Sequence, residues 1–385
     1  MKEIPRQVLK AWPPPDELFL ELGSRAVGAL KIGRPVSRGQ LLGPPRNPQD
    51  GLVHSPLNGY VTAIGQRSVT IKVDSSSIGL PPRPMAIEGL VGSDLEEALR
   101  SLGVDLPIAP PPGEPAIISA LVPEPGLDCA WVLWEDQLAT LKAGAAVLRR
   151  LWPDGEFIEV VSPRSAPLGL GRLARCSERY PYTLPPLVKR KILGTWDPLA
   201  RGMVEPSDLW AIGSVARSGL PLTSAPITIQ YSSYLAPFGV RVSEALSQMN
   251  LSPLPGDVVV LGGLVRGRPT ARLEMGLSKS TKALHLIRSS SLIDSYGLCL
   301  GCGRCAASCP LELPMDLLAQ APVNQWPETA SRYSELLSGC LACGACALAC
   351  PSSRPLLSLA LMTKRTDCDD AARRQIGTAC ESPLS

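Results

Sequence analysis

Aromatic residues, histidine and long apolar runs are scarce in this sequence. Only 4% of its 385 residues are Phe, Trp or Tyr, and it has 2 histidines. No stretch approaches the roughly 20 consecutive apolar residues that a membrane-spanning helix needs, and the first residues show no apolar segment of signal-peptide type. We therefore expect an intracellular protein without a membrane-spanning helix, which could still dock on a membrane partner.

An excess of charge of one sign is also missing. Lys and Arg number 38 against 35 for Asp and Glu, a formal net charge of +3. This surplus is too small for the electrostatic footprint of a nucleic-acid-binding protein, so no nucleic-acid partner is expected. With 45% hydrophobic and 19% charged residues the chain is predicted to fold, and its length suggests about two to four domains.

Proline, glycine and cysteine, in contrast, are abundant. The 40 prolines and 34 glycines predict many turns and short elements. Most of the 12 cysteines lie in two short runs near the C-terminus. A secreted disulfide scaffold spreads its cysteines through a small domain, so this grouping in a reducing compartment indicates metal ligation.

Turn signals and periodicity divide the first part of the chain into two regions. Residues 1–80 are predicted to form a small β-sandwich or barrel, in which Asn58 and Gly59 make a hairpin turn. Residues 81–114 form a Pro-rich connector, which we expect to be a hinge or a wrapping linker. It contains one short helix from 93 to 102, capped by Ser93 and Glu96.

Residues 115–225 alternate strand and helix patterns. Strands at 116–122 and 156–161 flank a helix at 135–151, which predicts a parallel βαβ unit, and a further strand is expected at 208–213. The remaining regions are a grasp-like α+β module at 226–288, short helices around the cysteine runs at 289–365, and a polar tail at 366–385.

The two cysteine runs share the spacing C-x2-C-x2-C-x3-C-P, which is typical of bacterial ferredoxins with two [4Fe-4S] clusters. In this pattern the fourth cysteine of each run ligates the cluster that the other run holds. The first cluster is therefore predicted to be held by Cys299, Cys302, Cys305 and Cys350. The second is predicted to be held by Cys340, Cys343, Cys346 and Cys309.

Structural zinc is one alternative for these cysteines, and a purely structural cluster is another. A tetrahedral zinc ion needs neither the third cysteine of each run nor the trailing Cys-Pro. Two neighbouring clusters with complete cysteine ligation leave no iron open for catalysis, so no catalytic residue is predicted. A one-electron relay is favoured over a structural role.

Other residues with reactive or charged side chains receive weaker interpretations. His54 and His285 are expected to be structural. Basic residues around the cluster region either offset cluster charge and guide an acidic electron donor or form an ordinary surface: Lys279, Lys282, Arg288, Arg304, Arg354, Lys364 and Arg365. No role is assigned to the cysteines outside the two runs, which are Cys129, Cys176, Cys368 and Cys380.

The order of these parts resembles the C subunit of the Rnf ion-translocating electron transport complex. The residues that carry the resemblance are Lys31–Gly33, Gly39–Leu42, His54–Gly59 and, most specifically, Cys340–Pro355. The resemblance implies a multidomain α/β and β protein. Its parts are an N-terminal barrel-sandwich hybrid, a Rossmann-like domain, an SLBB-like β-grasp module and an α-helical ferredoxin-type domain with two [4Fe-4S] clusters.

The resemblance also implies a place in the cell. It suggests a cytoplasmic protein, peripheral on the inner face of the cell membrane. Its partners would be the membrane-bound and peripheral subunits of an Rnf-like complex, with ferredoxin or an NADH-linked donor as further candidates.

The flavin motifs of that family are largely missing here. The family's glycine-rich loop of the type GGAGFPT corresponds to Leu102–Gly113, which has no glycine cluster and is stiffened by proline. Its acidic motif of the type GAECEPY is reduced to Ala120–Gly126. The sequence therefore argues against FMN and NADH sites.

Three functions compete on this basis. The first is a relay subunit that carries single electrons between a soluble or peripheral donor and a membrane-bound Rnf-type oxidoreductase. The second is a flavin-dependent reductase similar to the cobalamin reductases of bacterial microcompartments, which would need a flavin site built from other residues. The third is a scaffold whose modules only dock partners.

Overall fold

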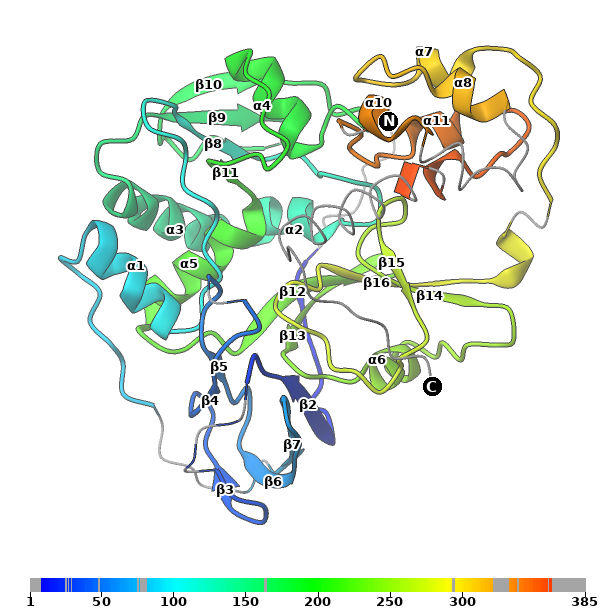
Figure 1. The fold of residues 1–385 in the computed structure, drawn as a ribbon. Coiled ribbons are helices and arrows are strands. Elements are labelled where there is room, and N and C mark those ends of the chain that lie inside the picture. Colours follow the sequence, from blue (N-terminus) through cyan, green and yellow to red (C-terminus); the bar gives the residue numbers. More distant parts are fainter. Residues whose placement is uncertain are drawn as a thin grey trace, which may run out of the picture. The chain divides into compact units, whose positions relative to one another are not determined.

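The computed structural model describes residues 8–361, apart from 25, 27, 29, 48, 75, 77–81, 163–164, 293–294, 321–331, 338 and 359 (Figure 1). The chain divides into two compact units, Met1–Ser290 and Ser291–Ser385. Within the described ranges, none of the helices combines the length and hydrophobicity needed to cross a bilayer. The tail predicted at 366–385, with Cys368 and Cys380, lies outside the described residues.

The first unit begins with a small β-sandwich. One sheet has the strand order β2-β7-β6-β3, and β4 pairs with β5 beside it. Inward-facing residues such as Leu18, Val69 and Ile71 are fully buried and fill the space between the strands. The strands are β2 (Glu17–Glu21), β3 (Pro35–Val36), β4 (Leu41–Gly43), β5 (Val53–His54), β6 (Gly59–Ile64) and β7 (Ser68–Val73).

The hairpin predicted at Asn58 and Gly59 is wrong. β6 begins at Gly59, but its partners are β3 and β7, whereas β5 pairs with β4. A Cβ on Gly59 would lie 2.1 Å from the carbonyl oxygen of Lys72. The glycine therefore permits the close approach of β6 and β7 rather than a turn.

The Pro-rich connector carries α1 (Gly92–Ser101), as expected, but its cap differs. The residue before the helix is Val91 and makes no side-chain cap, so the predicted capping box of Ser93 and Glu96 is wrong. The helix packs into the core through Leu95 and Leu99, which are fully buried. This part of the connector is therefore a packed element and not a hinge.

A parallel sheet follows, in the strand order β10-β9-β8-β11. All three of its strand pairs are parallel, including the pairing of β8 with β9 that the sequence predicted. Its strands are β8 (Ala116–Ser119), β9 (Phe157–Val161), β10 (Arg172–Arg175) and β11 (Met203–Val204). The helices of this region are α2 (Cys129–Asp136), α3 (Leu138–Leu151), α4 (Pro185–Leu193) and α5 (Pro206–Ser218).

The strand predicted at 208–213 is instead part of α5. Pro206 occupies the first turn of the helix, and Glu205 and Asp208 form a reciprocal capping box. These are the signals of a helix start. The buried residues Leu209, Ile212 and Val215 recur every three residues on one helical face, and a short apolar run alone does not distinguish a buried helix from a strand.

The last part of the first unit is a six-stranded sheet in the order β1-β13-β12-β16-β14-β15. β12 and β16 are parallel neighbours, while β13, β14 and β15 join through antiparallel pairs. The N-terminal strand β1 (Lys10–Ala11) pairs in parallel with β13. The other elements are β12 (Ser224–Ile229), β13 (Ser232–Pro237), α6 (Val242–Gln248), β14 (Val258–Leu261), β15 (Arg268–Thr270), β16 (Ala283–Ile287) and the 3-10 turn η1 (Ser289–Ser291).

Lys279 joins three segments of this unit. Its ammonium donates to the carbonyl oxygens of Gly51, Leu52 and Gly103 at 2.7 to 2.9 Å. Lys282 forms an ion pair with Glu205. Both lysines therefore bind groups of the first unit. These contacts explain their presence without a role in offsetting the charge of the clusters.

Another buried ammonium lies on α4. Lys189 is 1% exposed and its Nζ lies 2.8 Å from Glu114 Oε2 and 2.9 Å from Asp197 Oδ2. Burial alone would raise the pKa of the Asp197 carboxyl, but hydrogen bonds from Lys189 and Arg201 outweigh it and lower the pKa to about 2. Because the folded pKa lies below the ordinary value, this contact stabilises the fold above about pH 4 and is lost as the pH falls through about 2.

Replacing Lys189 by Met should therefore reduce the free energy of unfolding at pH 7 by about 3 kcal/mol, because two carboxylates lose a buried partner. The variant should also unfold at a higher pH on acidification, since the pKa of Asp197 returns towards its ordinary value. Urea and acid titrations followed by tryptophan fluorescence measure both effects. Lys191→Met, at an exposed position of the same helix, is the control, and equal stability of the two variants would contradict the assignment.

Candidate metal centre

The two cysteine runs fold into the same local structure. α7 (Arg304–Ala307) begins after Gly303, whose φ is 67°, and α11 (Ala345–Leu348) begins after Gly344, whose φ is 70°. Only glycine adopts this left-handed conformation at little cost. Each run therefore turns sharply between its second and third cysteines and enters a short helix that carries the third.

The likeness extends on both sides of these helices. Gly301 and Ala342, one in each run, have φ values of 64° and 51°. Glu312 and Ser353, each three residues after the last cysteine of its run, have φ values of 55° and 52°. The second unit therefore contains an internal repeat. Two further helices, α8 (Met315–Gln320) and α10 (Ser334–Leu337), lie between the two cysteine runs.

Backbone amides point at several of the sulfurs. The N–H of Gly301 donates to Cys299 Sγ at 3.4 Å, and the N–H of Ala342 donates to Cys340 Sγ at 3.3 Å. The left-handed turn brings each amide to the sulfur two residues earlier. Hydrogen bonds of this kind stabilise negative charge on sulfur and tune the reduction potential of a cluster.

Cysteines from both runs line one small cavity. Its cysteines are Cys309 from the first run and Cys340, Cys343 and Cys346 from the second. Apolar side chains, among them Leu313 and Met315, make up much of the rest of its wall. Cys309 thus reaches across to the three cysteines with which the spacing had grouped it.

The four cysteines of the other predicted set are not among the residues that line this cavity. Cys305 is buried in the apolar core of the second unit, and Cys299 and Cys350 pack against that core. Cys302 is exposed. The hydroxyl of Ser308 lies 3.0 Å from Cys305 O and 3.2 Å from Ala345 O, so it links α7 to α11.

These thiols resist ionisation on their own. Burial, and to a smaller extent repulsion from the neighbouring Cys340 and Cys343, raises the pKa of Cys346 to about 12. Burial likewise raises the pKa of Cys305 and of Cys343. Several thiolates can share this space only beside a strongly cationic group, and iron ions supply such charge. The residues therefore fit a metal group.

The geometry also bears on the kind of metal group. Among the described residues, no three His, Cys, Asp or Glu side chains stand close enough together to hold a single metal ion. A [4Fe-4S] cube is ligated by four cysteine thiolates, which surround the group rather than converge on one ion. Thiols that line a cavity are compatible with that arrangement.

Comparison with protein families decides the nature of this region. Residues 298–354 match the family described as 4Fe-4S dicluster domain. The C-terminal region is a 4Fe-4S ferredoxin-type domain. This dicluster domain contains all eight cysteines of the two runs.

A curated relative extends the likeness beyond the dicluster domain. It is the C subunit of the ion-translocating oxidoreductase complex of Rhodobacter capsulatus, to which the chain is 24% identical. The match covers 78% of this chain and 68% of the relative. A second sequence under the same name and from the same species matches equally.

Solved structures of an NAD+-reducing [NiFe]-hydrogenase are also similar. The air-oxidized form has a TM-score of 0.38 at 13% identity, covering 70% of this chain and 58% of that chain. The H2-reduced form has a TM-score of 0.37 at 14% identity, covering 71% and 62%. This chain therefore spans less than two thirds of the length of either.

Two features of the dicluster domain escaped the sequence reasoning. The left-handed conformation of Ala342 has no signal in its residue type, although its alignment with Gly301 in the repeat could have indicated it. The link through Ser308 has no signal in the repeat either, because the corresponding position of the second run is Ala349 and carries no hydroxyl.

The left-handed turn at Gly303 gives a direct test of the repeat. Its Cβ position is open space, so Gly303→Ala should cost about 1 kcal/mol through the backbone conformation alone. The dicluster domain should then lose its iron-sulfur absorbance at a lower urea concentration. Gly297→Ala is the matched control, since a Cβ there meets only ordinary contacts at 3.5 Å or more; equal urea midpoints would contradict the repeat.

Proposed function

We propose that this protein relays single electrons through two [4Fe-4S] clusters within an Rnf-type oxidoreductase complex. The observation that carries the proposal is the cavity in which Cys309 joins three cysteines of the other run, inside a dicluster domain. The name of the curated relative, a component of an ion-translocating oxidoreductase complex, supports the complex.

The proposed ligands follow the crossed pattern, in which the fourth cysteine of each run binds the cluster of the other run. Cys340, Cys343, Cys346 and Cys309 would hold one cluster, and Cys299, Cys302, Cys305 and Cys350 the other. Each cluster, when bound, accepts and releases one electron at a time. The protein contributes the thiolates, the amide hydrogen bonds to sulfur and an apolar wall. Because each run would supply the fourth ligand of the other run's cluster, the two clusters would lie close together.

The partners and location are inferred from the same relative. The membrane-bound and peripheral subunits of an Rnf-like complex are the proposed partners, with ferredoxin or an NADH-linked donor as a source of electrons. The proposed location is the inner face of the cell membrane, where the chain would bind as a peripheral subunit.

The finer domain architecture belongs to the same proposal. The sheet order β13-β12-β16-β14-β15 supports an SLBB-like β-grasp module at 226–288. In this sheet β12 and β16, the first and last strands of the module along the chain, are parallel neighbours at the centre. The sandwich of strands β2 to β7 supports a barrel-sandwich hybrid at 1–80, and the parallel sheet supports a Rossmann-like domain at 115–225. The ferredoxin-type domain is proposed to span 289–365.

Resident FMN is left out of the proposed function. The two segments that stand in for the family's flavin motifs contribute Leu106 and Glu124 to the wall of a large cavity in the first unit. The carboxylate of Glu124 accepts hydrogen bonds from the amides of Val265 and Arg266 at 3.2 and 2.7 Å. An anion cradle of backbone amides is thus already filled by the chain's own carboxylate, so this part of the wall does not fit a flavin phosphate.

Cysteine variants test the crossed ligation. Cys309→Ala should lower the iron content by about half and leave the same residual electron paramagnetic resonance signal as Cys343→Ala, from the other run. The residual signal of Cys309→Ala should differ from that of Cys302→Ala, although Cys302 belongs to the same run as Cys309. Cys176→Ala, outside both runs, is the control and should keep full iron. A residual signal of Cys309→Ala that matches Cys302→Ala would contradict the crossed assignment.

The second candidate is the flavin-dependent reductase, favoured by the size of the cavity in the first unit. It predicts stoichiometric flavin in the anaerobically purified protein and direct reduction of a corrinoid. The relay predicts iron without flavin and no corrinoid reduction by the isolated chain. Flavin analysis by fluorescence after acid release, together with iron content, separates the two.

A further inference from the structure

The loop that follows the second cysteine run is tied to the segment that precedes the first run. The amide of Gly297 donates to Ser352 O at 2.9 Å, and Arg354 Nη1 donates to Gly297 O at 3.2 Å. Gly297 lies two residues before Cys299, and Ser352 lies two residues after Cys350. Two proposed ligands of the same cluster therefore lie on segments that hydrogen bonds hold together.

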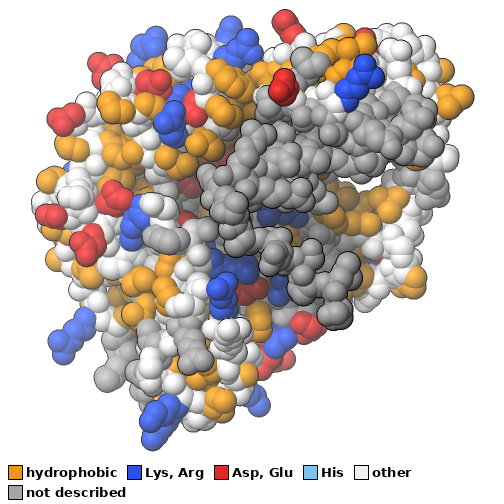
Figure 2. All heavy atoms as spheres, viewed as in Figure 1, with side chains coloured by type: hydrophobic (Ala, Val, Ile, Leu, Met, Phe, Trp, Pro, Cys, Tyr) orange, Lys and Arg blue, Asp and Glu red, His pale blue; other side chains and the backbone are white. Residues whose placement is uncertain are grey.

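Arg354 brings a charge that is shielded from solvent to this junction. The residue is 3% exposed, and an arginine side chain stays protonated even where it is buried. Charged side chains elsewhere are spread over the surface, as the face in Figure 2 shows, where water and salt screen them. A buried charge is screened much less, so it acts more strongly on the groups near it.

The internal repeat provides a comparison for this arginine. Arg354 and Leu313 each lie four residues after the last cysteine of their run, and each is followed by a proline. Leu313 lines the cavity that Cys309 also lines, and its amide donates to Cys309 Sγ at 3.4 Å. Arg354 does not line that cavity. The same position of the repeat therefore carries an apolar side chain for one cysteine set and a cation for the other.

The two cysteine sets also differ in their access to solvent. Cys302 is exposed, whereas Cys343, at the same position of the second run, is buried. Apolar side chains such as Met315 surround the set that contains Cys343. Water and a nearby cation stabilise an added negative charge, and an apolar wall disfavours it. The exposure of Cys302 and the charge of Arg354 therefore act in the same direction.

We propose that Arg354 raises the reduction potential of one cluster above that of the other. That cluster is the one whose proposed ligands are Cys299, Cys302, Cys305 and Cys350. The inference rests on the proposed relay and names a residue that sets its internal direction. Reduction adds one negative charge to a cluster, and a fixed cation near its ligands stabilises the reduced form. A single electron given to the protein therefore resides mainly on the cluster that Cys302 ligates.

Removing the charge while keeping a hydrogen-bond donor tests the proposal. Arg354→Gln should lower the equilibrium constant for placing the electron on this cluster about tenfold, which corresponds to about 59 mV for one electron. Arg354→Lys keeps the charge and should retain most of the difference. Arg304→Gln is the matched control, because Arg304 lies next to Cys305 on α7 but is exposed, so solvent screens its charge.

A redox titration of the anaerobically purified full chain with dithionite, followed by electron paramagnetic resonance, measures where the electron resides. The residual signal of Cys343→Ala identifies the cluster that Cys302 ligates, and that of Cys302→Ala identifies the other. At one electron per protein, the unchanged protein and Arg304→Gln should both show mainly the first of these signals. In Arg354→Gln the ratio of the two signals should shift about tenfold towards the second.

Arg354→Gln introduced into each cysteine variant gives the potential of each cluster by itself. It should lower the potential in Cys343→Ala and leave the potential in Cys302→Ala unchanged. Equal shifts in these two backgrounds, or equal effects of Arg354→Gln and either Arg304→Gln or Arg354→Lys, would overturn the proposal. So would a loss of iron from Arg354→Gln alone, since the residue would then serve the fold.

These outcomes are separate from a failure of the electron relay. If Arg354 has no special effect, two interacting clusters in the unchanged protein still support the relay. If the unchanged protein lacks two clusters, the relay itself is refuted.

Discussion

Cysteine thiols crowded into one apolar cavity cannot all ionise unless a cation holds their charge there. Burial and mutual repulsion raise the pKa of Cys346 to about 12. Burial also raises the pKa of Cys305 and of Cys343. Iron ions reverse this penalty by binding the thiolates directly. The dicluster domain is built around this requirement: left-handed residues turn the chain, short helices place the third cysteines, and amides face the sulfurs.

The first unit follows a different principle. Its segments are fastened by buried ammonium groups that use carbonyls and carboxylates from distant parts of the chain. Lys279 ties the sandwich and the connector to the six-stranded sheet, and Lys189 holds Glu114 and Asp197. Such ties fix the frame while loops rich in glycine and proline leave a large cavity open. The frame and the cavity depend on no iron, so the two units can serve separate tasks within one chain.

The sequence predicted those features whose signals are local. The cysteine spacing located the dicluster domain, and apolar periodicity found the parallel pairing of β8 with β9. Local signals misled where two structures share them. The short apolar run inside α5 reads equally as a strand, and Gly59 serves strand packing rather than a turn.

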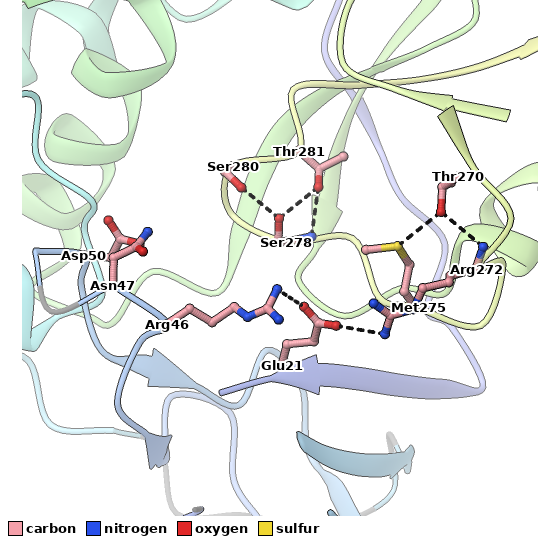
Figure 3. Close-up of polar contacts among 10 residues, drawn as sticks. All are labelled: Glu21, Arg46, Asn47, Asp50, Thr270, Arg272, Met275, Ser278, Ser280 and Thr281. Carbon is pink, nitrogen blue, oxygen red and sulfur yellow. Dashed lines mark hydrogen bonds and ion pairs between the residues drawn. The ribbon is translucent and has the colours of Figure 1, made fainter. Parts of the chain in front are cut away.

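Contacts between distant residues could not be predicted from these patterns. Glu21 meets Arg46 and Arg272, which lie 25 and 251 residues away (Figure 3). The pairing of β1 with β13 likewise joins the start of the chain to a distant strand of the six-stranded sheet. No periodicity or spacing encodes such pairs, because they arise only after the sheets have assembled. The cavity of the first unit is lined by segments that lie far apart in the sequence, so no local pattern predicts it.

Electron paramagnetic resonance of the fully reduced, anaerobically purified protein tests the central claim most directly. If crossed ligation holds two [4Fe-4S] clusters close together, the two reduced clusters interact magnetically. The account predicts a broadened, spin-coupled spectrum that simplifies to a single-cluster signal in Cys309→Ala. A colourless protein that contains zinc, or two signals that remain independent at full reduction, would contradict it.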